Sequence, residues 1–70
     1  MKYTVIVEET QSGFSGYVPD LPVGVAAASS REELMQLMAE AIPMHMELLR
    51  EDGDDIPPPR TSSMEIGVAA

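Results

Sequence analysis

The sequence has no cysteine, so no disulfide can cross-link the fold and no thiolate can hold zinc or an iron–sulfur cluster. This absence matters because 70 residues lie near the lower limit for unaided folding, where only roughly 60% of the unfolded chain's surface becomes buried. Self-association would bury more surface, so we expect a homo-oligomer, either a dimer or a higher assembly. We predict a single domain over residues 1–70.

Basic residues are also scarce: four of them face twelve acidic residues, for a net charge of −8. The four are scattered along the chain and form no stripe that could neutralise phosphates, so we expect no direct binding of nucleic acid. The negative field would attract a basic partner. An acidic surface also keeps a small domain soluble, and net charge alone does not separate these two interpretations.

Long apolar runs are missing as well. The opening MKYTVIV ends at Glu8-Glu9, which is too short for a signal peptide, and no small-residue cleavage site follows. No segment approaches the length needed to span a membrane. We therefore expect a cytoplasmic protein without membrane association.

Short alternating segments predict strands around one long helix. Pro19 cannot donate to a ladder, so the second strand should end there, and the third strand depends on Val23 and Val25. The expected elements are strands over 2–8, 14–18, 23–28 and 63–68, a helix within 29–52 and a polyproline-like connector over 57–60.

The helix has clear boundary signals. Ser30 and Glu33 have the spacing of a capping box, and Gly53 follows the last turn as a stop. Pro43 lies inside the helix and should kink it without dividing it, because the apolar stripe continues in phase on both sides.

The element order β-β-β-α-β predicts an α+β fold. An antiparallel meander followed by a right-handed crossover places the last strand parallel to the first. The result is a four-stranded mixed sheet of order 3-2-1-4, with the long helix packed across one face and a core over about residues 2–56.

The search for catalytic groups points away from an enzyme. His45 is the sole histidine, and the positions one helical turn away are apolar, so it is better read as a structural residue than as a metal ligand. The carboxylates of residues 51–55 lie beside glycine and proline with no apolar pocket implied, unlike an acid/base pair. We expect no cofactor and no metal, and an enzyme fragment using His45 is the weakest alternative.

Methionines crowd the helix, and they have two interpretations. Met35, Ala39 and Met46 flank the core stripe, which is wider than one sheet face requires. They either fill the core or form a self-association surface, to which adaptable methionine side chains are suited.

The run GFSGYVPDLP (13–22) resembles the hallmark of the HicB-like antitoxin family. Three further segments stand at the family's spacing: Glu8-Glu9 after the first strand, SREE (30–33) at the start of the helix, and GDDIPPP (53–59) beyond it. The resemblance covers roughly residues 2–60. Two departures are the order Val23-Gly24, where the family usually has glycine first, and Pro43 in the helix.

The resemblance implies a truncated ribonuclease-H-like fold without its catalytic carboxylates. It also implies a non-enzymatic antitoxin that binds and masks a small basic mRNA-cleaving toxin of the HicA type. We expect a stand-alone domain without the DNA-binding module that many family members carry. The alternative is an orphan homo-oligomeric regulatory or structural domain with no toxin partner. The carboxylates predicted to contact a basic partner are Asp20, Glu51, Asp52, Asp54 and Asp55.

Overall fold

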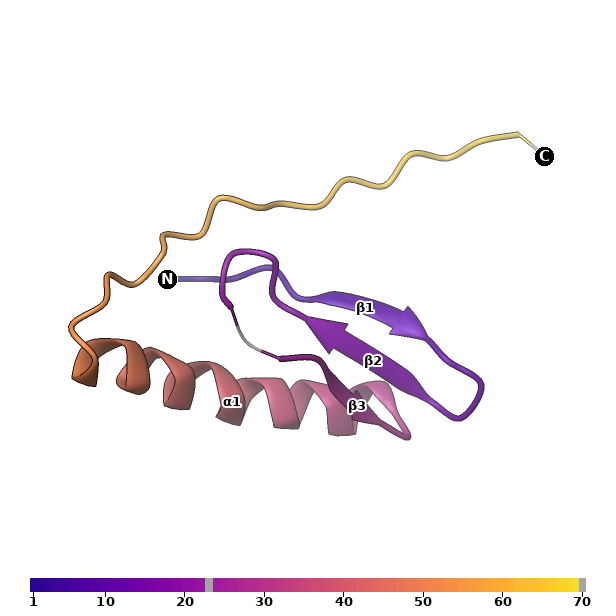
Figure 1. Ribbon diagram of the computed structural model, residues 1–70. Helices are drawn as coiled ribbons and strands as arrows, with labels where there is room; N and C mark the ends of the chain where they lie inside the picture. Colours follow the sequence, from indigo (N-terminus) through magenta and orange to yellow (C-terminus); the bar gives the residue numbers. More distant parts are fainter. Residues whose placement is uncertain (23, 70) are drawn as a thin grey trace.

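The computed structural model describes residues 1–22 and 24–69. It contains β1 (Ile6–Glu9), β2 (Phe14–Tyr17), β3 (Ala26–Ala28) and α1 (Arg31–Glu51). The described strands form one antiparallel sheet of order β1-β2-β3. Helix α1 packs on β2 and β3 and lies on one side of the sheet (Figure 1). The predicted α+β class is therefore confirmed.

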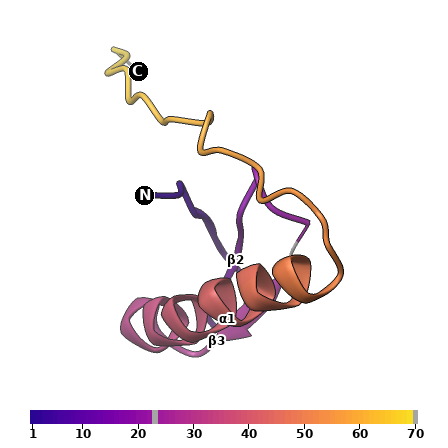
Figure 2. The ribbon, with the colours of Figure 1, turned by 90° about the vertical axis from the view of Figure 1, so that its left-hand side faces the viewer.

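The predicted fourth strand and the order 3-2-1-4 are not confirmed. In the described part of the chain, no strand follows α1, and both ribbon views show the C-terminal segment leaving the body of the molecule (Figures 1 and 2). Met64, Ile66 and Val68, whose alternation predicted the strand, are 85%, 77% and 83% exposed. Alternation shows that a segment suits a strand, whereas a ladder also needs a partner edge beside it.

The ladder between β1 and β2 is shorter than predicted. It pairs Ile6 with Tyr17 and Glu9 with Phe14, and this register would place Pro19 opposite Thr4. Proline has no N–H to donate, so the ladder stops before it. The predicted strand over 2–8 is thus reduced to four residues plus an unpaired lead-in.

β3 is formed by alanines and not by the valines that predicted it. Val25 precedes the strand and is 71% exposed, and Val23 lies outside the described residues. A side chain on Gly13 would overlap the carbonyl oxygen of Ala28, so the loop before β2 and the end of β3 lie in close contact. This close approach requires glycine at position 13.

The start of α1 is capped by serine as predicted. The Ser30 side chain accepts a hydrogen bond from the Glu33 backbone N–H at 3.1 Å, which satisfies one of the free donors of the first turn. Glu33 does not reach back to the cap residue. Its carboxylate accepts a hydrogen bond from the Ser29 hydroxyl at 3.0 Å instead.

The end of α1 is a Schellman motif. Gly53 has a φ of 75°, and its N–H donates to the Arg50 carbonyl at 3.1 Å, while the Asp54 N–H donates to the Leu49 carbonyl at 2.8 Å. Glycine occupies this left-handed position without steric cost. Upstream, α1 continues through Pro43 as one helix, in agreement with the sequence; the kink stays a prediction.

The described core is small. Its buried members are Val18, Leu21, Leu34 and Met38. A Cβ on Gly16 would lie 3.2 Å from Leu34 Cδ2, so the absence of a side chain at that position lets the helix approach β2. Self-association stays a prediction.

Candidate partner-binding surface

Four carboxylates lie at and just beyond the C-terminal end of α1. Glu51, Asp52, Asp54 and Asp55 are all exposed. The ion pair found within residues 1–22 and 24–69 joins Arg50 to Glu47 at 2.7 Å and leaves these four carboxylates out. Negative charges at a helix C-terminus oppose the helix dipole and repel one another, so this cluster does not stabilise the isolated chain. A basic partner would relieve that repulsion.

Asp20 has a different environment from the acidic cluster of residues 51–55. Its Oδ2 accepts hydrogen bonds from the backbone N–H groups of Arg60 at 2.9 Å and Thr61 at 2.8 Å. Its Oδ1 accepts one from the Thr61 hydroxyl at 2.7 Å. The hydrogen bonds from Thr61, with that from Arg60, hold the pKa of Asp20 below its ordinary value, because they favour the charged form.

The start of the chain reinforces this clamp. The Tyr3 hydroxyl donates to the Pro57 carbonyl, and the Thr4 hydroxyl donates to the Thr61 carbonyl at 2.8 Å. Residues 57–61 are therefore held against the lead-in to β1 and the turn after β2. Sequence reasoning did not identify Thr61 or Tyr3 as anchors, since single hydroxyls carry no spacing pattern that predicts a contact more than fifty residues away.

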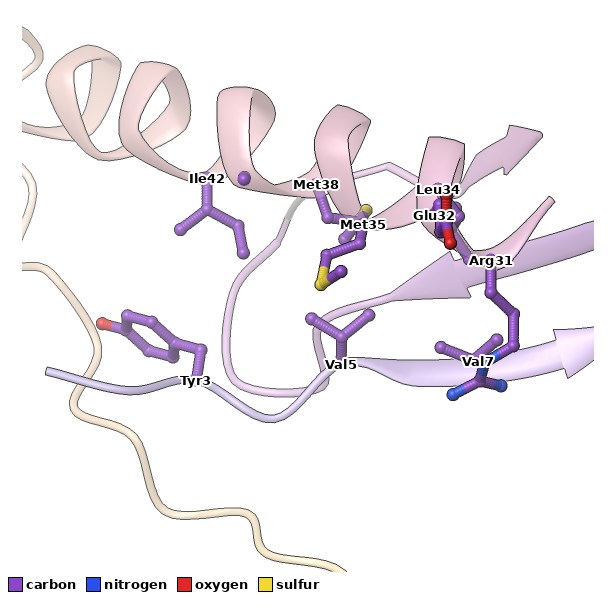
Figure 3. Close-up of a pocket in the computed structure, with 10 residues that line it drawn as sticks. Tyr3, Val5, Val7, Arg31, Glu32, Leu34, Met35, Met38 and Ile42 are labelled. Atoms are coloured by element: carbon purple, nitrogen blue, oxygen red, sulfur yellow. The ribbon is translucent and has the colours of Figure 1, made fainter.

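An apolar groove of about 680 Å³ lies between β1 with its lead-in and one flank of α1. Figure 3 shows the side chains of Tyr3 and Val5 pointing toward the helix, with Met35 and Ile42 projecting toward them. The groove exists because α1 packs on β2 and β3 and leaves β1 partly uncovered. Its lining residues are Tyr3, Val5, Val7, Arg31, Glu32, Leu34, Met35, Met38, Ala39 and Ile42.

The family model described as "HicB_like antitoxin of bacterial toxin-antitoxin system" matches residues 3–69. The chain belongs to the HicB-like antitoxin family. The resemblance drawn from GFSGYVPDLP and its companion segments is thereby confirmed.

One curated relative of this HicB-like chain comes from a bacteriophage. It is described as an uncharacterized 14.9 kDa protein in the rep-hol intergenic region of Haemophilus phage HP1 (strain HP1c1), and it is 33% identical over 57 residues. The alignment covers 81% of this chain and 43% of that protein, so the chain spans less than half of the relative's length. No solved structure matches the chain.

The residues predicted for self-association in the HicB-like chain are partly brought together. Met35 and Ala39 both line the groove, and both are exposed. Met46 is partly buried further along α1 and is not among the lining residues. The residues predicted to contact a partner fall into two groups. Asp20 accepts hydrogen bonds from its own chain, whereas the four carboxylates of residues 51–55 form no ion pair among the described residues.

No metal centre emerges in the described part of the HicB-like chain, where no group of three or more potential ligand side chains comes together. His45 is partly buried, and its Nε2 has no hydrogen-bond partner among the described residues. Among residues 1–22 and 24–69, no helix is long and apolar enough to cross a membrane.

Proposed function

We propose that this HicB-like protein is the antitoxin half of a toxin–antitoxin module. In this role it binds and masks a small basic mRNA-cleaving toxin of the HicA type and catalyses no reaction itself. Membership of the antitoxin family over residues 3–69 is the observation that carries the proposal. Because the target of such a toxin is mRNA, the complex would act in the cytoplasm.

The acidic cluster is the proposed contact for the toxin. Its four carboxylates lie at one end of α1, are exposed and form no ion pair among the described residues, since the neighbouring Arg50 pairs with Glu47. Charge complementarity of this kind mainly raises the association rate and fixes orientation. Masking itself would be steric, through the surface that the complex covers.

A direct contact of Asp20 with the toxin stays a prediction. Both oxygens of Asp20 accept hydrogen bonds from residues 60 and 61, so the cluster is the better place for a test. The protein would act as a single-domain homo-oligomer, with Met35 and Ala39 in the groove and Met46 beside it on α1 as the self-association residues.

The test compares two sets of neutralised carboxylates. In the first variant Glu51→Gln, Asp52→Asn, Asp54→Asn and Asp55→Asn are combined. The matched control combines Glu8→Gln, Glu9→Gln, Glu40→Gln and Glu65→Gln, all of them exposed. Each variant removes four negative charges and changes the net charge from −8 to −4, so they differ only in where the charge is lost.

The binding partner is the small basic protein encoded beside the antitoxin gene. Its association rate is measured by stopped flow at about 0.15 M salt, where screening acts over roughly 8 Å and distant charges contribute little. The cluster variant should associate about tenfold more slowly, and the control should stay within about twofold of the unaltered protein. Equal slowing of the two variants would contradict the role of the cluster.

The family role is tested separately by toxicity. Co-expression of the chain should restore growth and protect mRNA in cells that express the neighbouring gene. If the neighbouring product is neither toxic nor retained on the protein at low salt, the alternative of an orphan homo-oligomeric domain replaces the antitoxin proposal.

A further inference from the structure

Both outer strands of the sheet, β1 and β3, have an unpaired edge among the described residues, and the edge of β1 is the one beside the groove. β1 pairs with β2 along one side, and among the described residues nothing pairs with its other side. An unpaired strand edge presents backbone N–H and C=O groups that another strand can complete. The open edge therefore has room for one more strand.

The apolar groove lies beside this same edge. Tyr3, Val5 and Val7 form one wall of it, and Met35 belongs to the opposite wall (Figure 3). Ala39, on the same helix as Met35, also lines the groove. A strand added to β1 would place alternate side chains on the face that Val5 and Val7 share. Those side chains would enter the groove.

The segment with the matching pattern is the tail, which we define as residues 62–69. Met64, Ile66 and Val68 alternate along it and are 85%, 77% and 83% exposed. Three large apolar side chains with so little cover point to a partner surface. The tail carries a single charge, on Glu65, so the negative field of a second copy would repel it only weakly.

The tail is not directed into the groove of its own chain. Asp20 fixes Arg60 and Thr61, and beyond this clamp the tail runs away from the sheet in both views (Figures 1 and 2). Three consecutive prolines, Pro57–Pro59, stiffen the chain just before the clamp. A short, stiff hinge favours exchange of a segment between copies over folding back.

We propose that two copies of this chain exchange tails. The tail of each copy pairs with the open edge of β1 in the other and places Met64, Ile66 and Val68 in the other's groove. Tyr3 and Thr4 already contact residues 57–61 of their own chain, and the lengths of the remaining segments agree, since the five residues Val5–Glu9 and the five residues Met64–Val68 each extend roughly 17 Å. Two identical exchanges close on a twofold axis and leave neither β1 edge open. This inference goes beyond the antitoxin role and does not depend on a toxin.

Cross-linking tests the exchange directly, because the sequence contains no cysteine to interfere. A Met35→Cys chain and an Ile66→Cys chain carrying different tags are co-expressed, purified through both tags and treated with a short bis-maleimide. The matched control replaces Met35→Cys by Met44→Cys. Both methionines are 67% exposed, but they lie on opposite faces of α1.

The exchange predicts a covalent heterodimer from the Met35→Cys pair at a yield at least about fivefold above that of the Met44→Cys control. Equal yields would overturn the proposal. It would also be overturned if the double variant Met35→Cys/Ile66→Cys cross-linked only within one chain, because the tail would then occupy its own groove.

Mass in solution supplies a second readout. Replacing Met64, Ile66 and Val68 by serine should convert the dimer to a monomer, as measured by light scattering. The matched control replaces Leu37, Met44 and Leu48, three exposed apolar residues of α1, by serine as well, and this variant should remain a dimer. A monomeric unaltered protein at all concentrations, or dissociation of both variants, would reject the exchanged tail.

Discussion

Leu34 provides the most direct test of how the helix is held on the sheet. It is 1% exposed, the most deeply buried side chain in the described core. Leu34→Ala removes three carbon atoms, worth about 2.4 kcal/mol at roughly 0.8 kcal/mol each. The neighbouring Gly16 has no side chain that could move into the space, so a cavity remains and raises the total cost to about 3–4 kcal/mol.

That cost is large for a protein of this size. At roughly 0.05–0.15 kcal/mol per residue, 70 residues provide a free energy of unfolding of only about 3.5–10 kcal/mol. With a urea m-value near 1 kcal/mol/M, Leu34→Ala should lower the unfolding midpoint by about 3 M. Circular dichroism at 222 nm would follow the transition at two protein concentrations, because association also adds stability.

Leu48→Ala is the matched control for Leu34→Ala. It makes the same chemical change in the same helix, but Leu48 is 56% exposed, so the free energy of unfolding should change by less than about 0.5 kcal/mol. If Leu34→Ala prevents folding, Leu34→Met provides a measurable case with an expected cost below about 1.5 kcal/mol. Equal effects of the two alanine variants would refute the packing of α1 on the sheet through Leu34.

Three further predictions concern the two ends of α1 and the hydrogen bonds between Asp20 and Thr61. Ser30→Ala removes the cap to Glu33 and should lower the free energy of unfolding by about 1 kcal/mol in urea titrations. Gly53→Ala places a side chain at positive φ and should cost roughly 1–2 kcal/mol in the same assay, and no loss would contradict the Schellman motif. The pKa of Asp20 is lowered in the folded state. Its contribution to the free energy of unfolding is therefore fully present above the unfolded pKa of about 3.9 and is lost as the pH falls through the lower folded value. Amide hydrogen exchange at Thr61, corrected for the intrinsic rate, should therefore lose protection below about pH 4, and unchanged protection there would contradict the clamp.

The parts of the fold that were predicted correctly depend on local chemistry. The Ser30 cap, the Gly53 stop and the end of β2 before Pro19 each follow from the hydrogen bonds or dihedral angles that one residue type permits. The signals of β3 and of residues 63–68 were misleading for a different reason. A strand needs a partner edge and room beside it, and neither is encoded in the alternation of apolar residues.

The candidate site, too, could be predicted from the sequence only in part. The exposure of the carboxylates of residues 51–55 could be predicted from the sequence, because four negative charges that outnumber the nearby cations stay in solvent. The role of Asp20 was not evident, since its three hydrogen bonds come from residues forty positions away. The groove was anticipated only through Met35 and Ala39, and its β1 wall depends on where α1 crosses the sheet.

The sequence by itself determined the family, the helix with its boundaries and the excess of negative charge. These properties follow from residue type and spacing along the chain. Only the tertiary structure decided that Asp20 holds the segment after the prolines, that β1 keeps an open edge beside an apolar groove, and that the last apolar residues lie outside the sheet. Contacts between distant segments depend on how the elements pack, and local pattern does not specify that packing.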